Sequence, residues 1–141
     1  MLFAEGKEVG RSLTERDMAD NARQLLALAR QRNCRVILPE DAVIAAELAP
    51  GTASRIVASD AVPQDMMILD IGPKTVAGIA AALEGVPTLV WNGPLGAFET
   101  APFDHGTTAV AKKVAELTQA GKLLSVAGGG DTVAALSLIH I

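Results

Sequence analysis

Short β-branched runs alternate with segments of helical periodicity along this chain, and this alternation restricts the possible folds more than any other feature of the sequence. It is typical of a parallel sheet covered by helices, because neighbouring parallel strands need a long crossover between them. Apolar residues make up 50% of the 141 residues, enough for one compact domain with a buried core. We therefore expect an α/β fold.

The expected elements follow from the apolar pattern. Short apolar runs predict strands at residues 35–39, 55–60, 66–72, 87–91 and 123–127. Apolar residues at helical spacing predict helices over residues 14–32, 76–83 and 107–120. Residues 41–48 also have helical composition, and Gly121 is expected to end the helix over 107–120.

The first predicted helix has a capping signal in front of it. Ser12 and Glu15 have the spacing of a capping box. The expected inner face of this helix is one apolar stripe, formed by Met18, Ala22, Leu25, Leu26 and Ala29.

Charge and cysteine content exclude several classes of protein. The formal net charge is -4, and the basic residues form no stripe that would neutralise phosphates, so we expect no nucleic-acid partner. We expect neither a signal peptide nor a membrane partner, since no run approaches the roughly 20 apolar residues that a spanning helix needs. Cys34 is the only cysteine and has no partner for an internal disulfide, which indicates the reducing cytoplasm.

A run of glycines stands between the strand at 123–127 and a helix that begins at Asp131. In open α/β folds, ligands bind at this carboxyl edge of the sheet. Residues without Cβ let an oxyanion approach the backbone, and the N–H groups at the helix start point toward it. Asp131 is suited to bind Mg²⁺ directly or through water. The alternative is a tight strand-to-helix turn in which Asp131 serves only as N-cap.

Two other predicted strands end in similar loops. After residues 87–91, Asn92 carries an amide, Pro94 stiffens the loop, and Glu99 is suited to accept hydrogen bonds from sugar hydroxyls. The alternative for Glu99 is a solvated acid on a surface loop. In the third loop, Asp70 lies at the expected sheet edge, and Lys74 either meets a phosphate as a point charge or is simply solvated.

The stretches "NCRVILPED", "LDIGPKT", "WNGPLGAFE" and "GGGDT", in this order, closely resemble the C-terminal, nucleotide-binding domain of phosphoglycerate kinase. The resemblance implies a three-layer α/β/α Rossmann-like domain with a parallel sheet, incomplete at both ends. It covers residues 1–136 as a partial C-terminal domain, and residues 137–141 form a tail that does not match.

The resemblance also implies phosphoryl transfer in glycolysis, between 1,3-bisphosphoglycerate and ADP, giving 3-phosphoglycerate and ATP with Mg²⁺. Asp131 would reach the metal. Ile68 stands where many relatives have glycine, so the wall beside the adenine differs here. The implied nucleotide-binding residues are Leu69, Asn92, Pro94, Glu99, Gly128, Gly129, Gly130, Asp131 and Thr132.

Several parts of the family pattern have no counterpart in this sequence. They include the N-terminal domain that binds phosphoglycerate, the lysine that contacts the transferring phosphates and the glycine-rich adenine loop. We therefore expect a fragment with no catalytic residue, which carries part of the Mg-nucleotide site and transfers no phosphate alone, whereas the complete enzyme is expected to be monomeric. The alternatives are a stand-alone nucleotide- or phosphate-binding module without catalysis, and an α/β scaffold whose glycine turns are only structural.

Overall fold

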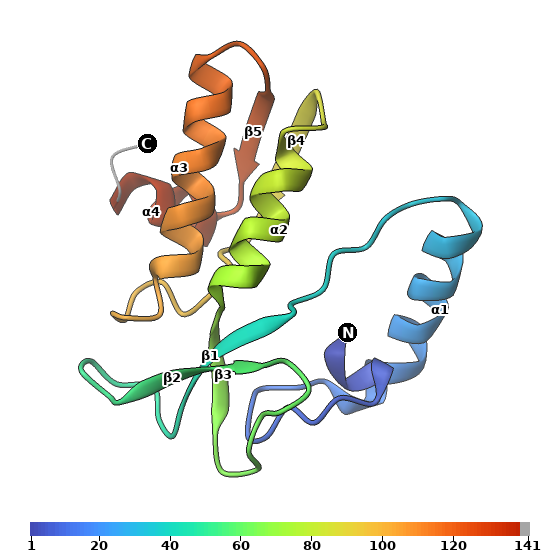
Figure 1. The fold of residues 1–141 in the computed structure, drawn as a ribbon, viewed down its shortest axis with the longest axis vertical. Helices are drawn as coiled ribbons and strands as arrows, with labels where there is room; N and C mark the ends of the chain where they lie inside the picture. The colour runs from blue at the N-terminus through green and yellow to red at the C-terminus, as the bar shows by residue number, and fades with distance from the viewer. Residues whose placement is uncertain (139–141) are drawn as a thin grey trace.

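The strands of the protein form two small sheets in a computed structural model that describes residues 1–138 (Figure 1). One sheet is antiparallel, in the order β2-β1-β3, and consists of β1 (Asp41–Ala45), β2 (Ser54–Ala58) and β3 (Met67–Ile71). The other sheet is a parallel pair of β4 (Thr88–Asn92) and β5 (Leu124–Gly128).

Helices α2 and α3 lie side by side next to the β4–β5 pair, while α1 lies apart from them with the N-terminal segment (Figure 1). The α-helices are α1 (Ala19–Gln31), α2 (Pro73–Leu83), α3 (His105–Gln119) and α4 (Gly130–Leu138). Two 3-10 helices, η1 (Leu2–Glu5) and η2 (Arg16–Met18), contact α1. Within residues 1–138, no helix is long and apolar enough to cross a membrane.

The α/β class and the parallel pairing are confirmed, although the antiparallel sheet was not anticipated. The predicted strands at 55–60, 66–72, 87–91 and 123–127 correspond to β2, β3, β4 and β5. The predicted helices at 76–83 and 107–120 correspond to α2 and α3, and Gly121 follows α3 with a left-handed φ of 68°. The local apolar pattern was sufficient for these elements, although β2 and β5 are largely exposed in the structure.

The strand predicted at residues 35–39 is wrong. This segment is irregular, and Val36 and Ile37 are 42% and 38% exposed. A strand needs a neighbour for its backbone hydrogen bonds, and within residues 1–138 this segment pairs with no strand.

The helical interpretation of residues 41–48 is also wrong, because the first part of this segment is β1. Ile44 and Ala45 are fully buried, and β1 pairs along its length with β2 on one side and β3 on the other. Backbone pairing on both edges outweighs the high intrinsic helix propensity of the alanines, because tertiary context overrides propensity.

The capping box predicted from Ser12 and Glu15 does not form, and the helix begins only at Ala19. The Ser12 hydroxyl donates to the Val9 carbonyl and accepts a hydrogen bond from the backbone N–H of Ile68, at 2.8 Å. Ser12 therefore attaches the N-terminal segment to β3 instead of capping a helix.

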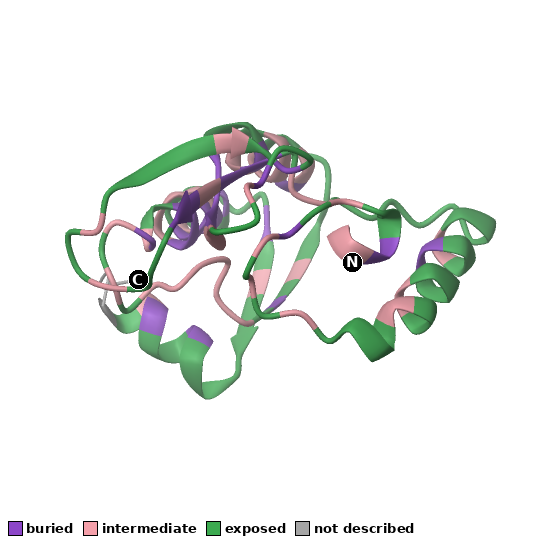
Figure 2. Ribbon diagram, turned by 90° about the horizontal axis from the view of Figure 1, so that it is seen from below, coloured by how far each residue is buried: buried purple, intermediate pink, exposed green. Residues whose placement is uncertain are grey.

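The apolar stripe predicted for this helix is only partly buried. Leu26 is buried, whereas Met18 and Leu25 are 46% and 55% exposed. Figure 2 shows α1 largely exposed. The reason is that α1 packs mainly against η1 and η2, which are too short to cover the stripe.

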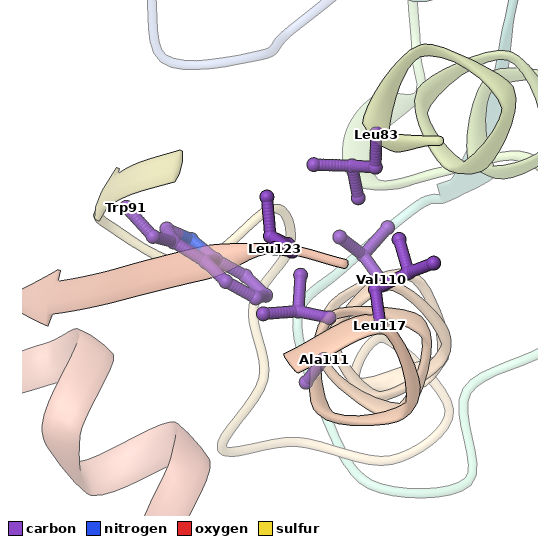
Figure 3. Packing of buried hydrophobic residues seen from close by; sticks show 7 residues of the cluster. Leu83, Trp91, Val110, Ala111, Leu117 and Leu123 are labelled. Carbon is purple, nitrogen blue, oxygen red and sulfur yellow. The ribbon is translucent and has the colours of Figure 1, made fainter. Parts of the chain in front are cut away.

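The largest apolar core lies between the β4–β5 pair and the helices α2 and α3. Figure 3 shows Trp91 and Leu123 directed toward Val110 and Leu117 of α3. A smaller cluster inside the antiparallel sheet contains Ala42, Ile44 and Val62. The larger core holds Trp91 of β4, and Leu123 directly before β5, against residues 110–117 of α3.

Of the tail expected over residues 137–141, Ser137 and Leu138 are the last residues of α4. Residues 139–141 lie outside the described part of the chain. The proposed boundary after residue 136 stays a prediction.

Candidate functional site

The parallel strands β4 and β5 end together, with Asn92 paired to Gly128. Directly after this pair, Gly129 turns the chain into α4 with a left-handed φ of 93°. A Cβ at Gly129 would lie 2.6 Å from Oδ1 of Asn92, closer than real Cβ contacts. The backbone angle favours glycine at this position, and the Asn92 amide lies directly against it.

The loop after β4 is attached to the start of α4. The backbone N–H of Gly93 donates to the Thr132 hydroxyl at 2.6 Å, and Thr132 is only 2% exposed. The Trp91 indole N–H donates to the Gly93 carbonyl, also at 2.6 Å. The Thr132 hydroxyl therefore joins the two loops from a buried position.

The same loop is attached to β3 and α3. The backbone N–H of Ala97 donates to the Leu69 carbonyl at 2.8 Å, and that of Leu95 donates to the Thr107 hydroxyl at 3.0 Å. Through these bonds the structure connects Leu69 on β3 with the loop that carries Pro94. Sequence reasoning missed Thr107, since a threonine in the first turn of a helix gives no signal of a bond to a distant loop.

The outer rim of this site is open. Gly128, Gly129, Gly130 and the side chains of Glu99 and Asp131 are exposed. Within residues 1–138, the carboxylates of Glu99 and Asp131 take part in no hydrogen bond or ion pair. The first amides of α4 lack intrahelical partners, so this end of the helix offers N–H donors and the positive end of its dipole.

Asp70 lies beneath the loop and not at an open edge. It is 1% exposed, and its carboxylate accepts hydrogen bonds from the backbone N–H of Ile71 at 2.8 Å and of Gly106 at 2.7 Å. Burial raises the pKa of Asp70 and Asp104 adds to this effect, although the two N–H donors and His105 act in the opposite direction. Its position near the end of a predicted buried strand was the only sequence signal for Asp70.

The comparisons with known proteins agree with this arrangement. The family model described as phosphoglycerate kinase matches residues 1–141, the whole chain. The chain belongs to the phosphoglycerate kinase family. It is 57% identical over 136 residues to the phosphoglycerate kinase of Cereibacter sphaeroides and 56% identical to that of Methylorubrum extorquens. Each alignment covers 96% of this chain, and the chain spans 34% of the length of these relatives.

A solved structure shows the same fold. The structure of phosphoglycerate kinase from Coxiella burnetii superposes with a TM-score of 0.93 at 38% sequence identity. The match covers 99% of this chain and 35% of that one. The antiparallel sheet, the parallel pair and the strand-end loops are therefore arranged as in a phosphoglycerate kinase.

In this member of the phosphoglycerate kinase family, Asp41 fixes the start of α2 as Asp70 fixes that of α3. The buried Asp41 carboxylate accepts hydrogen bonds from the backbone N–H of Lys74 at 3.0 Å and of Thr75 at 2.8 Å, and from the Thr75 hydroxyl at 2.7 Å. Burial raises the pKa of Asp41, but the Thr75 hydroxyl, the two N–H donors and the Lys74 charge outweigh it, so the net pKa is lowered. Lys74 is exposed on the first turn of α2.

The residues at the start of α4 fit a magnesium ion that arrives with phosphate. Mg²⁺ keeps several waters and is usually bound through one or two carboxylates together with substrate phosphates. Asp131 supplies one exposed carboxylate next to the exposed Gly128–Gly130 backbone. This donor set suits a metal–phosphate complex and is too small to hold the ion alone.

Proposed function

We propose that this chain provides part of the Mg-nucleotide site of a phosphoglycerate kinase. The proposal rests mainly on the contacts that join the loops after β4 and β5. Gly129 packs against the Asn92 side chain, and the Thr132 hydroxyl accepts a hydrogen bond from the backbone N–H of Gly93. These contacts fix an open glycine backbone beside an exposed carboxylate. Such a backbone at a helix start is suited to bind phosphate oxygens.

The proposed roles of the residues follow their places around this rim. Gly128, Gly129, Gly130 and Thr132 would surround the phosphates, with Asp131 as the ligand to Mg²⁺. Asn92 and Pro94 would line the nucleotide site, and Glu99 would accept hydrogen bonds from the ribose hydroxyls. Leu69 would lie beside the adenine, next to Ile68.

In the complete enzyme, a phosphoryl group would pass between 1,3-bisphosphoglycerate and ADP to give 3-phosphoglycerate and ATP. Catalysis of this kind consists largely of positioning and of stabilising the charge on the transferring group. Mg²⁺ would neutralise phosphate charge when bound, and this chain's amides would orient the phosphates. Phosphoglycerate would bind through an N-terminal domain outside this chain. We infer a cytoplasmic enzyme that is monomeric when complete and binds neither nucleic acid nor membranes.

The direct test is a titration of the 141-residue chain with MgADP, followed by Trp91 fluorescence. Trp91 is 8% exposed and adjoins Asn92, so its emission reports both folding and events at the rim. We expect a saturable change, with affinity lowered about tenfold or more by Asp131→Ala and by Glu99→Ala. Glu47→Ala, at an exposed acid after β1, is the matched control and should bind as the unsubstituted chain does. A blue-shifted emission that does not respond to MgADP would contradict the proposal.

A coupled assay of ATP formation tests the inactivity of the isolated chain. We expect no phosphoryl transfer, because positioning of the second substrate requires the N-terminal domain. ATP formation proportional to the concentration of the purified chain would show that this expectation is wrong.

A further inference from the structure

We propose that Asp70 is a positioning residue of the nucleotide site, which sets the loop after β4 at the distance from β3 and α3 that nucleotide binding requires. The inference rests on the proposed function, because it concerns the loop that carries Pro94 and Glu99. Asp70 would act through the backbone around it and would not touch the nucleotide.

The first observation is how the carboxylate is held. Its two oxygens accept from different elements, since Oδ1 accepts from Ile71 N–H on β3 and Oδ2 accepts from Gly106 N–H in the first turn of α3. A buried carboxylate that is not hydrogen-bonded would be costly, and these bonds fix the orientation of the group. Asp70 thereby links the end of β3 to the start of α3.

The second observation is that two glycines pack against this carboxylate. A Cβ at Gly96, in the loop after β4, would lie 2.3 Å from Oδ1 of Asp70 and 2.6 Å from the Phe103 carbonyl oxygen. A Cβ at Gly106 would lie 2.4 Å from the same oxygen. A side chain at either position requires a shift of the backbone or of the carboxylate, so the loop and the start of α3 both lie directly on the carboxylate.

The third observation is that the neighbouring loop residues are bonded to the elements that Asp70 connects. Ala97 donates to the carbonyl of Leu69, the residue before Asp70, and Leu95 donates to Thr107, the residue after Gly106. A change at Asp70 therefore shifts both anchor points of the loop together. Pro94 precedes this anchored stretch and Glu99 follows it, so both move with it.

The chain offers a matched control for the effect of stability alone. Asp41 is also a buried carboxylate that holds the start of a helix from a neighbouring strand, and Gly72 packs against it as Gly96 does against Asp70. Asp41 holds α2, however, and its carboxylate is hydrogen-bonded to Lys74 and Thr75 instead of to elements that anchor the loop after β4. A purely structural role predicts similar consequences for the two substitutions, whereas a positioning role predicts that they differ.

The test compares Asp70→Asn with Asp41→Asn in the 141-residue chain, at a temperature below the unfolding transition of each variant. The amide keeps one acceptor and replaces the other by a donor, so both variants should be less stable. We expect Asp70→Asn to weaken MgADP binding about tenfold and Asp41→Asn to change it less than about twofold. Amide hydrogen exchange at Ala97 and Leu95 should become faster only in Asp70→Asn.

Each outcome has a distinct meaning. Equal MgADP affinities of the two variants, whether weakened or not, would overturn the positioning role and leave the proposed function standing. An unsubstituted chain that does not bind MgADP would overturn the proposed function, and the inference with it. Where Asp70→Asn does not fold, Gly96→Ala replaces it, because the added methyl group pushes the loop away from the same carboxylate, and the same loss of affinity is expected.

Discussion

The Thr132 hydroxyl, at the start of α4, accepts a hydrogen bond of 2.6 Å from the backbone N–H of Gly93, which follows β4. The two residues are 39 positions apart in the sequence and come from the ends of neighbouring parallel strands. Thr132 is buried and Gly93 is half-buried, so the N–H group has limited access to water as a substitute acceptor. It holds the two loops of the site in one arrangement.

Thr132→Val should therefore separate the two loops without changing the size of the side chain. The half-buried Gly93 N–H loses its acceptor, and we expect the free energy of unfolding to fall by about 1 kcal/mol. Urea unfolding followed by Trp91 fluorescence measures this change. Thr132→Ser keeps the hydroxyl and should recover most of the loss. Equal stabilities of the two variants would show that the bond does not hold the loops.

Gly130→Ala distinguishes a phosphate site from a structural turn. Gly130 has no heavy atom within 4 Å of an added Cβ, and alanine favours a helix over glycine by about 1 kcal/mol, so stability should be unchanged or higher. If phosphate approaches this backbone, the methyl group obstructs it, and we expect MgADP binding to weaken about tenfold. The Trp91 titration measures the affinity.

Gly78→Ala is the control for this substitution. Gly78 lies inside α2 and also has open space around an added Cβ. Its stability should be unchanged or higher as well, with no change in affinity. Unaltered MgADP binding by Gly130→Ala would favour the alternative in which the glycines only form a tight turn.

The pH dependence of stability should reveal the role of Asp41. Its pKa in the folded chain lies below the ordinary value of 3.8, so its stabilising effect is fully present above pH 3.8 and is lost as the pH falls through the lowered pKa. At neutral pH, Asp41→Asn should lower the free energy of unfolding by about 1–2 kcal/mol. Urea unfolding over a series of pH values should show this difference shrinking below pH 3.8. A stability difference between the unsubstituted chain and Asp41→Asn that stays constant down to the lowest pH would contradict the lowered pKa of Asp41.

The outer face of the β4–β5 pair should make the isolated chain associate. Val90 and Val126 are paired across the strands and are 76% and 54% exposed, and Leu124 on the same sheet is 63% exposed. Exposed apolar strands with unpaired edges favour contact between copies. Sedimentation velocity should show association that rises with concentration and decreases in the double variant Val90→Thr, Val126→Thr.

Leu13→Thr is the comparison for this prediction, because Leu13 is a fully exposed leucine outside the sheets. It should leave the association unchanged. Association that is the same in all three proteins would show that the β4–β5 face is not the contact surface.

The elements nearest the site were predictable because their signals are local. The runs that became β3, β4 and β5 are short and apolar, and each ends at a glycine, asparagine or proline that stops a strand. The segments that became α2 and α3 have apolar residues at helical spacing. Since parallel strands share one carboxyl edge, the order of these elements was sufficient to predict that Asn92 and the glycine run lie close together.

The sequence by itself determined the α/β class and the strand-end loops, because periodicity and turn chemistry are properties of neighbouring residues. The family followed from the resemblance of four short motifs, which are also local in the sequence. Only the tertiary structure decided that Asp41–Ala45 is a strand, that Asp70 is buried beneath the loop, and that Thr132 accepts from Gly93. These features depend on backbone partners and packing supplied by residues far away in the sequence. Burial increases the contribution of each of these hydrogen bonds to stability, because a buried polar group without a partner is costly and water is not available to replace the partner.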